Sequence, residues 1–203
     1  EPTSAVLGRA GWDVVEGLPD GGRTPWVAVV GRGLRPVGQA TALSAAASVE
    51  VGDRELIVYG SLLPWLSAPT HVPHLAEGRP SERFFSEELA RQRAEIAELG
   101  SHGTPVVWAG DHNQNLAGPV SGSHRRRRML ADAIVSLGLV AWNADAPHAI
   151  DGCCAIDLIC GPPDFEVGVI EVLPAGRRGV EVSDHNGYLV EVTVPGVPGG
   201  TQG

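Results

Sequence analysis

Three short groups of polar residues stand where apolar runs are expected to end as strands, and their side chains suit phosphate chemistry. They are Gly110-Asp111-His112-Asn113, Ile156-Asp157 and Asp184-His185. This placement would gather carboxylates, an amide and an imidazole at one end of a sheet. Oxygen ligands of this kind bind hard divalent cations, so the cluster would suit a metal ion and a phosphate ester.

Each group has its own chemical use. The two-residue spacing of Asp111 and Asn113 puts both side chains on one side, where a carboxylate can take a proton from water and an amide can hold that water. Asp184 can ligate a hard cation, and the imidazole of His185 can donate to a phosphoryl oxygen. Asp157 lies between apolar residues, where a carboxylate is costly to bury without a partner. A facing histidine would satisfy it and would be held protonated.

Plainer interpretations of the same residues stay open. Gly110, Asp111 and Asn113 are common turn residues, and Asp184-His185 could lie in a solvated loop. A structural salt bridge to an arginine is the alternative for Asp157.

Short apolar, β-branched runs separated by glycine and proline predict many strands. They are residues 12–16, 26–31, 41–51, 56–63, 105–110, 139–142, 155–160, 165–172 and 188–194. The small, polar composition of residues 40–50 is typical of a strand near a sheet edge. Apolar residues at helical spacing predict helices over residues 84–99 and 124–137, each followed by glycine. Many strands with two helices and no regular βαβ alternation favour a layered α/β (α+β) fold with sheets packed face to face.

Composition narrows the class of protein. A chain of 203 residues with a net charge of −9 forms one domain, residues 1–203, and lacks the excess of basic residues that non-specific nucleic-acid binding usually needs. A nuclease is not excluded, because metal-binding carboxylates contribute to that charge. No apolar run approaches the roughly 20 residues that cross a bilayer, and the first residues do not show the basic-then-apolar pattern expected of a leader peptide. Cys153, Cys154 and Cys160 do not form a disulfide pattern, which favours a reducing cytoplasm.

Taken together, the three groups resemble the signatures of the endonuclease/exonuclease/phosphatase superfamily, which includes DNase I. Gly110-Asp111-His112-Asn113, Ile156-Asp157-Leu158-Ile159 and Ser183-Asp184-His185 follow the family's order, with a strand expected before each. The resemblance covers residues 11–194. It implies the DNase I-like four-layer sandwich, in which two packed, mainly antiparallel sheets are flanked by helices. It also implies a metal-dependent phosphoesterase, with a phosphate ester and possibly nucleic acid as substrate, and no obligate protein partner.

The resemblance assigns roles by position. Asp111 would activate or orient the attacking water, with Asn113 in support. His185 would contact the phosphoryl group and be held by Asp157. Asp184 would face the metal, Mg²⁺ or Mn²⁺.

The chain departs from the family's pattern in two places. The family's opening strand and its asparagine are missing, so we expect an N-terminally incomplete domain in which Glu1 is the family's metal-ligand glutamate. An arbitrary terminal residue is the alternative for Glu1. Family members also place a phosphate-contacting His or Tyr just before the proline that corresponds to Pro64. Ser61 and Leu62 fall nearest that place here, with Tyr59 two residues earlier on the face of Ser61.

Tyr59 and Ser61 are therefore candidate substrate contacts, although Tyr59 also fits a core position. His148 and Asp151, just upstream of Asp157, are further candidates. The four arginines of residues 125–128 are interpreted as a solvated face, with a phosphate-backbone contact as the alternative.

Two further features of the sequence concern the core and the tail. Gln92, on the apolar face of its helix, is expected to bond a buried backbone group. Residues 195–203 are expected to form a flexible tail.

Two other functions compete with the enzyme. The first is a catalytically silent family member or fragment that binds a ligand or partner through the same cleft. The missing opening strand favours it, and the intact set of Asp111, Asn113, Asp157, Asp184 and His185 opposes it. The second is a thiol-based redox or zinc protein that uses the three cysteines.

Overall fold

A computed structural model describes residues 3–20, 25–177, 180–181 and 183–196. Its centre is a six-stranded sheet in the order β3-β4-β5-β6-β8-β7, in which only the β5–β6 pair is parallel. The strands of this sheet are β3 (Arg35–Thr41), β4 (Ser44–Val51), β5 (Arg54–Leu62), β6 (Val106–Asp111), β7 (Val140–Ala141) and β8 (Asp157–Gly161).

Three two-stranded antiparallel pairs accompany this sheet. They are β1 (Asp13–Glu16) with β2 (Ala28–Gly31), β9 (Glu166–Leu173) with β12 (Gly187–Thr193), and β10 (Gly176–Arg177) with β11 (Val180–Glu181). The helices are α1 (Thr3–Arg9), α2 (Ala68–His71), α3 (Pro73–Ala76), α4 (Ser81–Leu99) and α5 (His124–Ser136).

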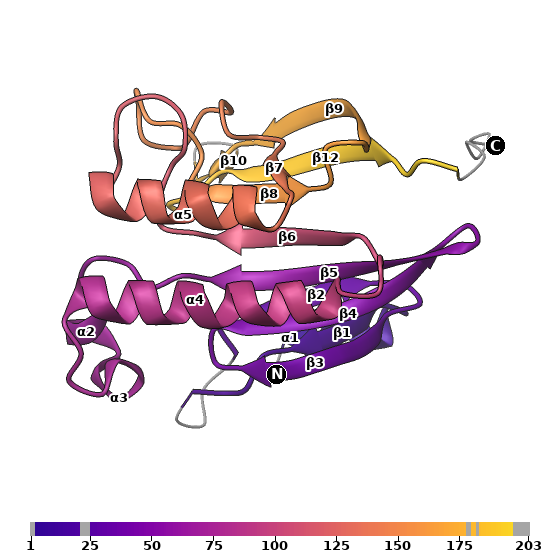
Figure 1. Cartoon of the computed structure of the whole chain (residues 1–203), viewed down its shortest axis with the longest axis horizontal. Coiled ribbons are helices and arrows are strands. Elements are labelled where there is room, and N and C mark those ends of the chain that lie inside the picture. Colours follow the sequence, from indigo (N-terminus) through magenta and orange to yellow (C-terminus); the bar gives the residue numbers. More distant parts are fainter. Residues whose placement is uncertain (1–2, 21–24, 178–179, 182, 197–203) are drawn as a thin grey trace.

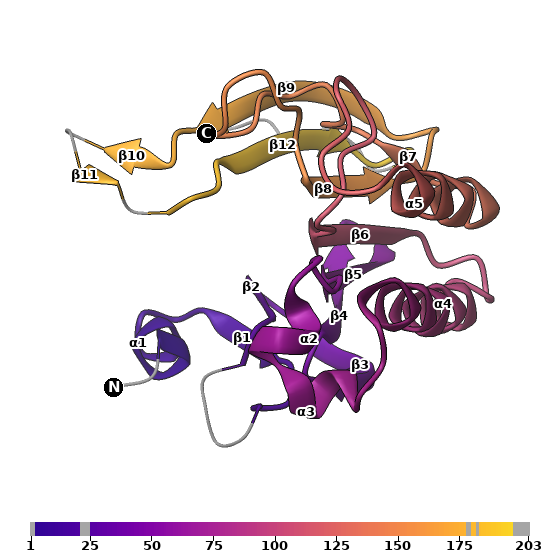
Figure 2. The ribbon, with the colours of Figure 1, turned by 90° about the vertical axis from the view of Figure 1, so that its left-hand side faces the viewer.

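The sheet is covered on both faces. Helices α4 and α5 lie along one face, and the pairs β1–β2 and β9–β12 lie against the other (Figures 1 and 2). Because side chains alternate along a strand, Ile57, Trp108 and Leu158 pack under the helices, whereas Leu56 and Val107 pack toward β9–β12. The structure confirms the predicted α/β fold of packed, mainly antiparallel strands flanked by helices.

The strand predicted over residues 41–51, near a sheet edge, is confirmed as β4. It begins three residues later than predicted, because β3 and β4 form a hairpin that turns between Thr41 and Ser44. β3 is the edge strand, where the missing amide hydrogen of Pro36 costs no ladder bond on the open side. β4 is the next strand inward, and its small residues are buried because the neighbouring layers pack closely on them. The strand β3 and the helix α1 were not predicted.

The arginine run of α5 is not a uniform solvated face. Arg125 and Arg128 are exposed, but the side chain of Arg126 is buried. Its guanidinium donates to Glu82 Oε1 at 2.9 Å and to the backbone oxygen of Pro64 at 3.0 Å. Arg126 therefore joins α5 to the start of α4 and to the segment after β5.

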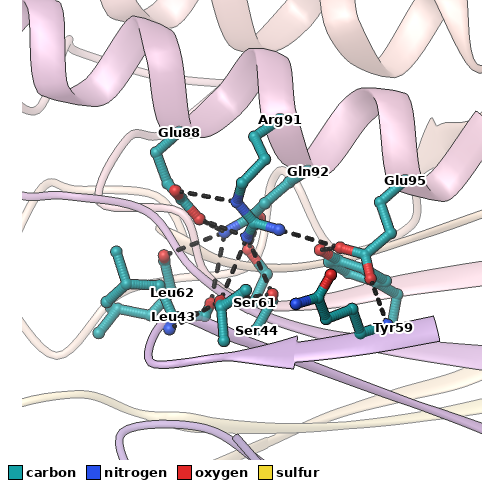
Figure 3. A network of polar contacts seen from close by, with 11 residues as sticks. Leu43, Ser44, Tyr59, Ser61, Leu62, Glu88, Arg91, Gln92 and Glu95 are labelled. Carbon is teal, nitrogen blue, oxygen red and sulfur yellow. Dashed lines mark hydrogen bonds and ion pairs between the residues drawn. The ribbon is translucent and has the colours of Figure 1, made fainter. Parts of the chain in front are cut away.

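A polar network joins α4 to β4 and β5 beneath the helix (Figure 3). Gln92 is fully buried; its Nε2 donates to the backbone oxygens of Leu43 and Leu62, each at 3.3 Å, and its Oε1 accepts from Ser61 Oγ at 2.6 Å. This confirms the expectation that Gln92 bonds buried backbone groups. The network holds the end of β5 in place, and the register of the sheet sets Leu62 opposite Asp111.

Two remaining sequence observations concern the membrane and the cysteines. Among the described helices, none is long and apolar enough to cross a bilayer. Cys153, Cys154 and Cys160 are free thiols, and Cys160 is buried.

Candidate active site

Asp111 ends β6 directly after Gly110, which lies against the backbone of β5. The preceding Gly110 has φ +146°, and a Cβ built on it would lie 1.9 Å from the backbone oxygen of Ser61 on β5. Only glycine fits this position, since an L side chain rarely adopts that φ and the space is filled. The glycine thus explains how β6 can lie close against β5 and still present Asp111 at its end.

Asn113 is tied to Asp111 as its spacing predicted. Its backbone amide donates to Asp111 Oδ1 at 2.8 Å, and its side-chain Nδ2 donates to the backbone oxygen of Leu63 at 2.9 Å. Asn113 adopts a left-handed φ of +51°, which asparagine tolerates better than most residues. The turn therefore fixes the orientation of the Asp111 carboxylate. It leaves Asn113 Oδ1 available to accept a hydrogen bond.

Asp157 and His185 form the predicted pair. Asp157 begins β8 directly opposite Asp111 in the antiparallel register, and His185 Nδ1 lies 2.9 Å from Asp157 Oδ2. Both side chains are about three-quarters buried, with 25% and 28% of their surface exposed. The structure thus brings together side chains from three segments that are far apart in the sequence.

The charges of this cluster shift one another's pKa values. Burial, together with the neighbouring charge of Asp157, raises the pKa of Asp111 to about 6, although the Asn113 amide and His185 oppose the rise. Burial also raises the pKa of Asp157, against the effect of His185. For His185, burial acts to lower the pKa, but the carboxylates of Asp157, Asp111 and Asp184 outweigh it and raise the pKa.

His148 lies beside this pair, as its position upstream of Asp157 suggested. Its residue surface is 7% exposed, and its ring meets the His185 ring edge-on with centroids 5.1 Å apart. Its Nδ1 accepts from the backbone amide of Ile150 at 3.0 Å. Burial, and then the charge of His185, lowers the pKa of His148.

The carboxylates at this end of the sheet are of the chemical kind that hard cations prefer. Asp184 projects into solvent with 90% of its side chain exposed, and its Oδ2 lies 4.0 Å from His185 Nε2. The carboxylates of Asp111, Asp157 and Asp184 are oxygen donors of the kind that Mg²⁺ and Mn²⁺ prefer. Glu1, the other predicted ligand, lies outside the described residues.

Among the described residues, one group of possible metal ligands lies close together, but it is chemically less suitable for a hard cation. Atoms of His148, Asp157 and His185 lie within 4.8 Å of one another. A histidine binds a metal through an unprotonated nitrogen. His148 offers none while its Nδ1 accepts from Ile150, because its other nitrogen then carries the proton.

Tyr59 and Ser61 were expected to contact the substrate, but the structure places both side chains away from the site. The reason is the alternation of side chains along β5. Ser61 is paired with Gly110 and Leu62 with Asp111, so Asp111 shares the face of Leu62 and not that of Ser61. Tyr59 and Ser61 point under α4, where the Tyr59 hydroxyl donates to Glu95 at 2.7 Å (Figure 3). Tyr59 is a core tyrosine. The fourth candidate, Asp151, is exposed in a turn.

Sequence reasoning missed three residues that hold the site. Asn143 is buried; its Nδ2 donates to the backbone oxygen of Asp157 at 2.9 Å, and its Oδ1 accepts from the amide of Ile159 at 2.8 Å. Asn186 and Tyr188 both donate to the backbone oxygen of Pro147, at 3.1 Å and 2.9 Å. For Asn143, the available signal in the sequence was an amide side chain directly after the apolar segment 139–142. Asn186 and Tyr188 bind a backbone oxygen, and the sequence carries no pattern that predicts such a contact.

Comparison with solved structures shows that the chain has a DNase I-like fold, which it shares with solved nuclease structures. The chain is similar to a 3'-5' exonuclease from Neisseria meningitidis, with a TM-score of 0.68 and 17% identity over 94% of this chain and 83% of the other. An AP endonuclease from Archaeoglobus fulgidus gives a TM-score of 0.64 and 14% identity over 95% and 83%. The catalytic domain of human Nocturnin, solved with a sulfate anion, gives 0.60 and 15% over 93% and 75%. No family model and no curated protein matches the sequence.

Proposed function

We propose that this protein is a divalent-metal-dependent phosphoesterase that hydrolyses a phosphate ester by direct attack of water on phosphorus. One observation carries the proposal: Asp111, Asn113, Asp157 and His185, from three distant segments, converge at one end of the sheet in hydrogen-bonded geometry. The same convergence argues against a silent family member, in which some of these residues would be expected to be lost.

The roles of the residues follow from their contacts. Asp111 accepts the proton of the attacking water, and a pKa of about 6 suits a base that works near neutral pH. The Asn113 amide fixes the orientation of this carboxylate, and its free Oδ1 can accept from the same water. His185, kept protonated by Asp157, donates to a phosphoryl oxygen as negative charge grows there.

A divalent cation would be held by Asp184 and, as the resemblance implies, by Glu1. Bound there, Mg²⁺ or Mn²⁺ would neutralise the charge of the leaving oxygen by Lewis-acid catalysis. The position of Asp184, with Oδ2 4.0 Å from His185 Nε2 at the border of the cluster, supports this assignment.

The substrate class is a phosphodiester or phosphomonoester, with nucleic acid as the first to test. A Neisseria relative of the fold, also solved bound to a product DNA hairpin, is described as a 3' phosphatase. The net charge of −9 makes any DNA contact depend on local groups and on the cation.

The test is hydrolysis of a generic phosphodiester and of a 3'-phosphorylated DNA by purified protein. We expect turnover with Mg²⁺ or Mn²⁺ and none in excess EDTA, with activity restored when the metal is added back. Equal rates with and without EDTA would reject the metal-dependent mechanism.

A further inference from the structure

The ring of His148 has a proton position that can be deduced from its contacts. The backbone amide of Ile150 points at Nδ1 from 3.0 Å, and a backbone N–H can only donate. Nδ1 is therefore unprotonated, and the neutral ring carries its hydrogen on Nε2. His148 is thus a hydrogen-bond donor at Nε2.

That donor has no acceptor within the described part of the protein. His148 is 7% exposed, and its Nε2 is buried without a hydrogen-bond partner. An unpaired buried donor costs about 1–3 kcal/mol, so one in a native fold calls for an explanation. A ligand that supplies the acceptor is the explanation favoured by its surroundings.

The surroundings are those of the proposed catalytic cluster. A ring nitrogen of His148 lies within 4.8 Å of ligand atoms of Asp157 and His185. Hydrogen bonds hold the loop that carries His148. The backbone oxygen of Pro147 accepts from the Tyr188 hydroxyl at 2.9 Å, and the backbone amide of His148 donates to the backbone oxygen of Cys153 at 2.9 Å. Two imidazole donors thus stand side by side, 5.1 Å apart between ring centroids.

We propose that His148 donates from Nε2 to a non-bridging phosphoryl oxygen of the substrate, next to the oxygen that His185 contacts. The inference rests on the proposed function, which supplies the phosphoryl group. It gives the site a neutral second donor to phosphate beside His185, a contact that Tyr59 and Ser61 cannot make because they point under α4. A metal-ligand role for His148 would instead require the Ile150 hydrogen bond to break.

Inorganic phosphate and NMR of the histidine ring nitrogens test the binding step without any need for turnover. In the free protein we expect His148 as the Nε2–H tautomer, and added phosphate should shift that nitrogen. His148→Ala should weaken phosphate binding, whereas His102→Ala, an exposed loop control, should not. An Nδ1–H tautomer, an Nε2 unmoved by phosphate, or Zn²⁺ coordinated through His148 would overturn the inference.

Turnover separates this inference from the proposed function. We expect His148→Ala to lose roughly 10²-fold in kcat/KM, as on removal of one donor from an oxyanion site. His148→Gln, whose amide can still donate, should recover about tenfold of the loss. If the wild type hydrolyses no ester but binds phosphate through His148, the proposed phosphoesterase function is refuted and the donor role of His148 is supported. If His148→Ala turns over at the normal rate, the donor role of His148 is refuted and the phosphoesterase function stands.

Discussion

Replacing Gly110 by alanine should damage the protein far more than an ordinary surface substitution. The new Cβ would lie 1.9 Å from the backbone oxygen of Ser61, so β5 and β6 must separate by more than 1 Å to reach normal contact. The unusual φ of +146° costs about 1–3 kcal/mol for any L residue. Each strand hydrogen bond weakened by the separation adds about 1 kcal/mol. We therefore expect a loss of about 3–5 kcal/mol in the free energy of unfolding.

Gly138→Ala is the matched control. Gly138 also has a positive φ, +69°, but a Cβ there meets nothing within 4 Å. Only backbone strain applies, so we expect a loss of about 1–2 kcal/mol. Urea unfolding of both variants measures the difference, and the loss for Gly110→Ala should correspond to roughly 10 °C in Tm. Equal destabilisation of the two variants would refute the argument that strand contact requires glycine before Asp111.

Four other expectations can be measured. The pH profile of kcat/KM should be bell-shaped: it falls below about pH 6 as Asp111 is protonated, and falls again on the alkaline side as His185 loses its proton above its raised pKa. Asp157→Asn removes the charge that raises both pKa values, so both limbs should move to lower pH in the same assay. Gln92→Leu leaves buried carbonyl groups without a donor and should cost about 1–3 kcal/mol in urea unfolding. Arg126→Met removes a buried guanidinium that donates to three acceptors, and it should lower the free energy of unfolding by about 3 kcal/mol in urea. A smaller loss would contradict the inference that Arg126 joins α5 to α4.

The main polar groups of the site could be predicted because strand ends leave a signature in sequence. Apolar runs that stop at Asp111 and near Asp157 mark positions at a sheet edge, and the order of the polar groups resembles the signatures of a known superfamily. The pairing of Asp157 with His185 followed from the cost of a lone buried carboxylate.

The errors came from information that lies outside local sequence. Alternation shows that Tyr59 and Ser61 share a face, but the face covered by α4 depends on how the chain crosses between the parallel strands β5 and β6. The donor role of His148 depends on a backbone amide and on a loop held by Tyr188, a residue 41 positions from Pro147. Pro36 and Gly38 hid β3, because an edge strand tolerates residues that central strands exclude.

The account depends most on Asp111 and His185 acting on the same phosphorus atom. The direct test is kcat/KM for the wild type, Asp111→Asn, His185→Ala and the double variant, all in Mg²⁺, with folding checked by urea unfolding. Because groups that act as one unit are not additive, we expect each single change to abolish most activity and the double variant to be no worse than the poorer single one. Losses that multiply in the double variant, or a folded single variant with wild-type turnover, would contradict the account.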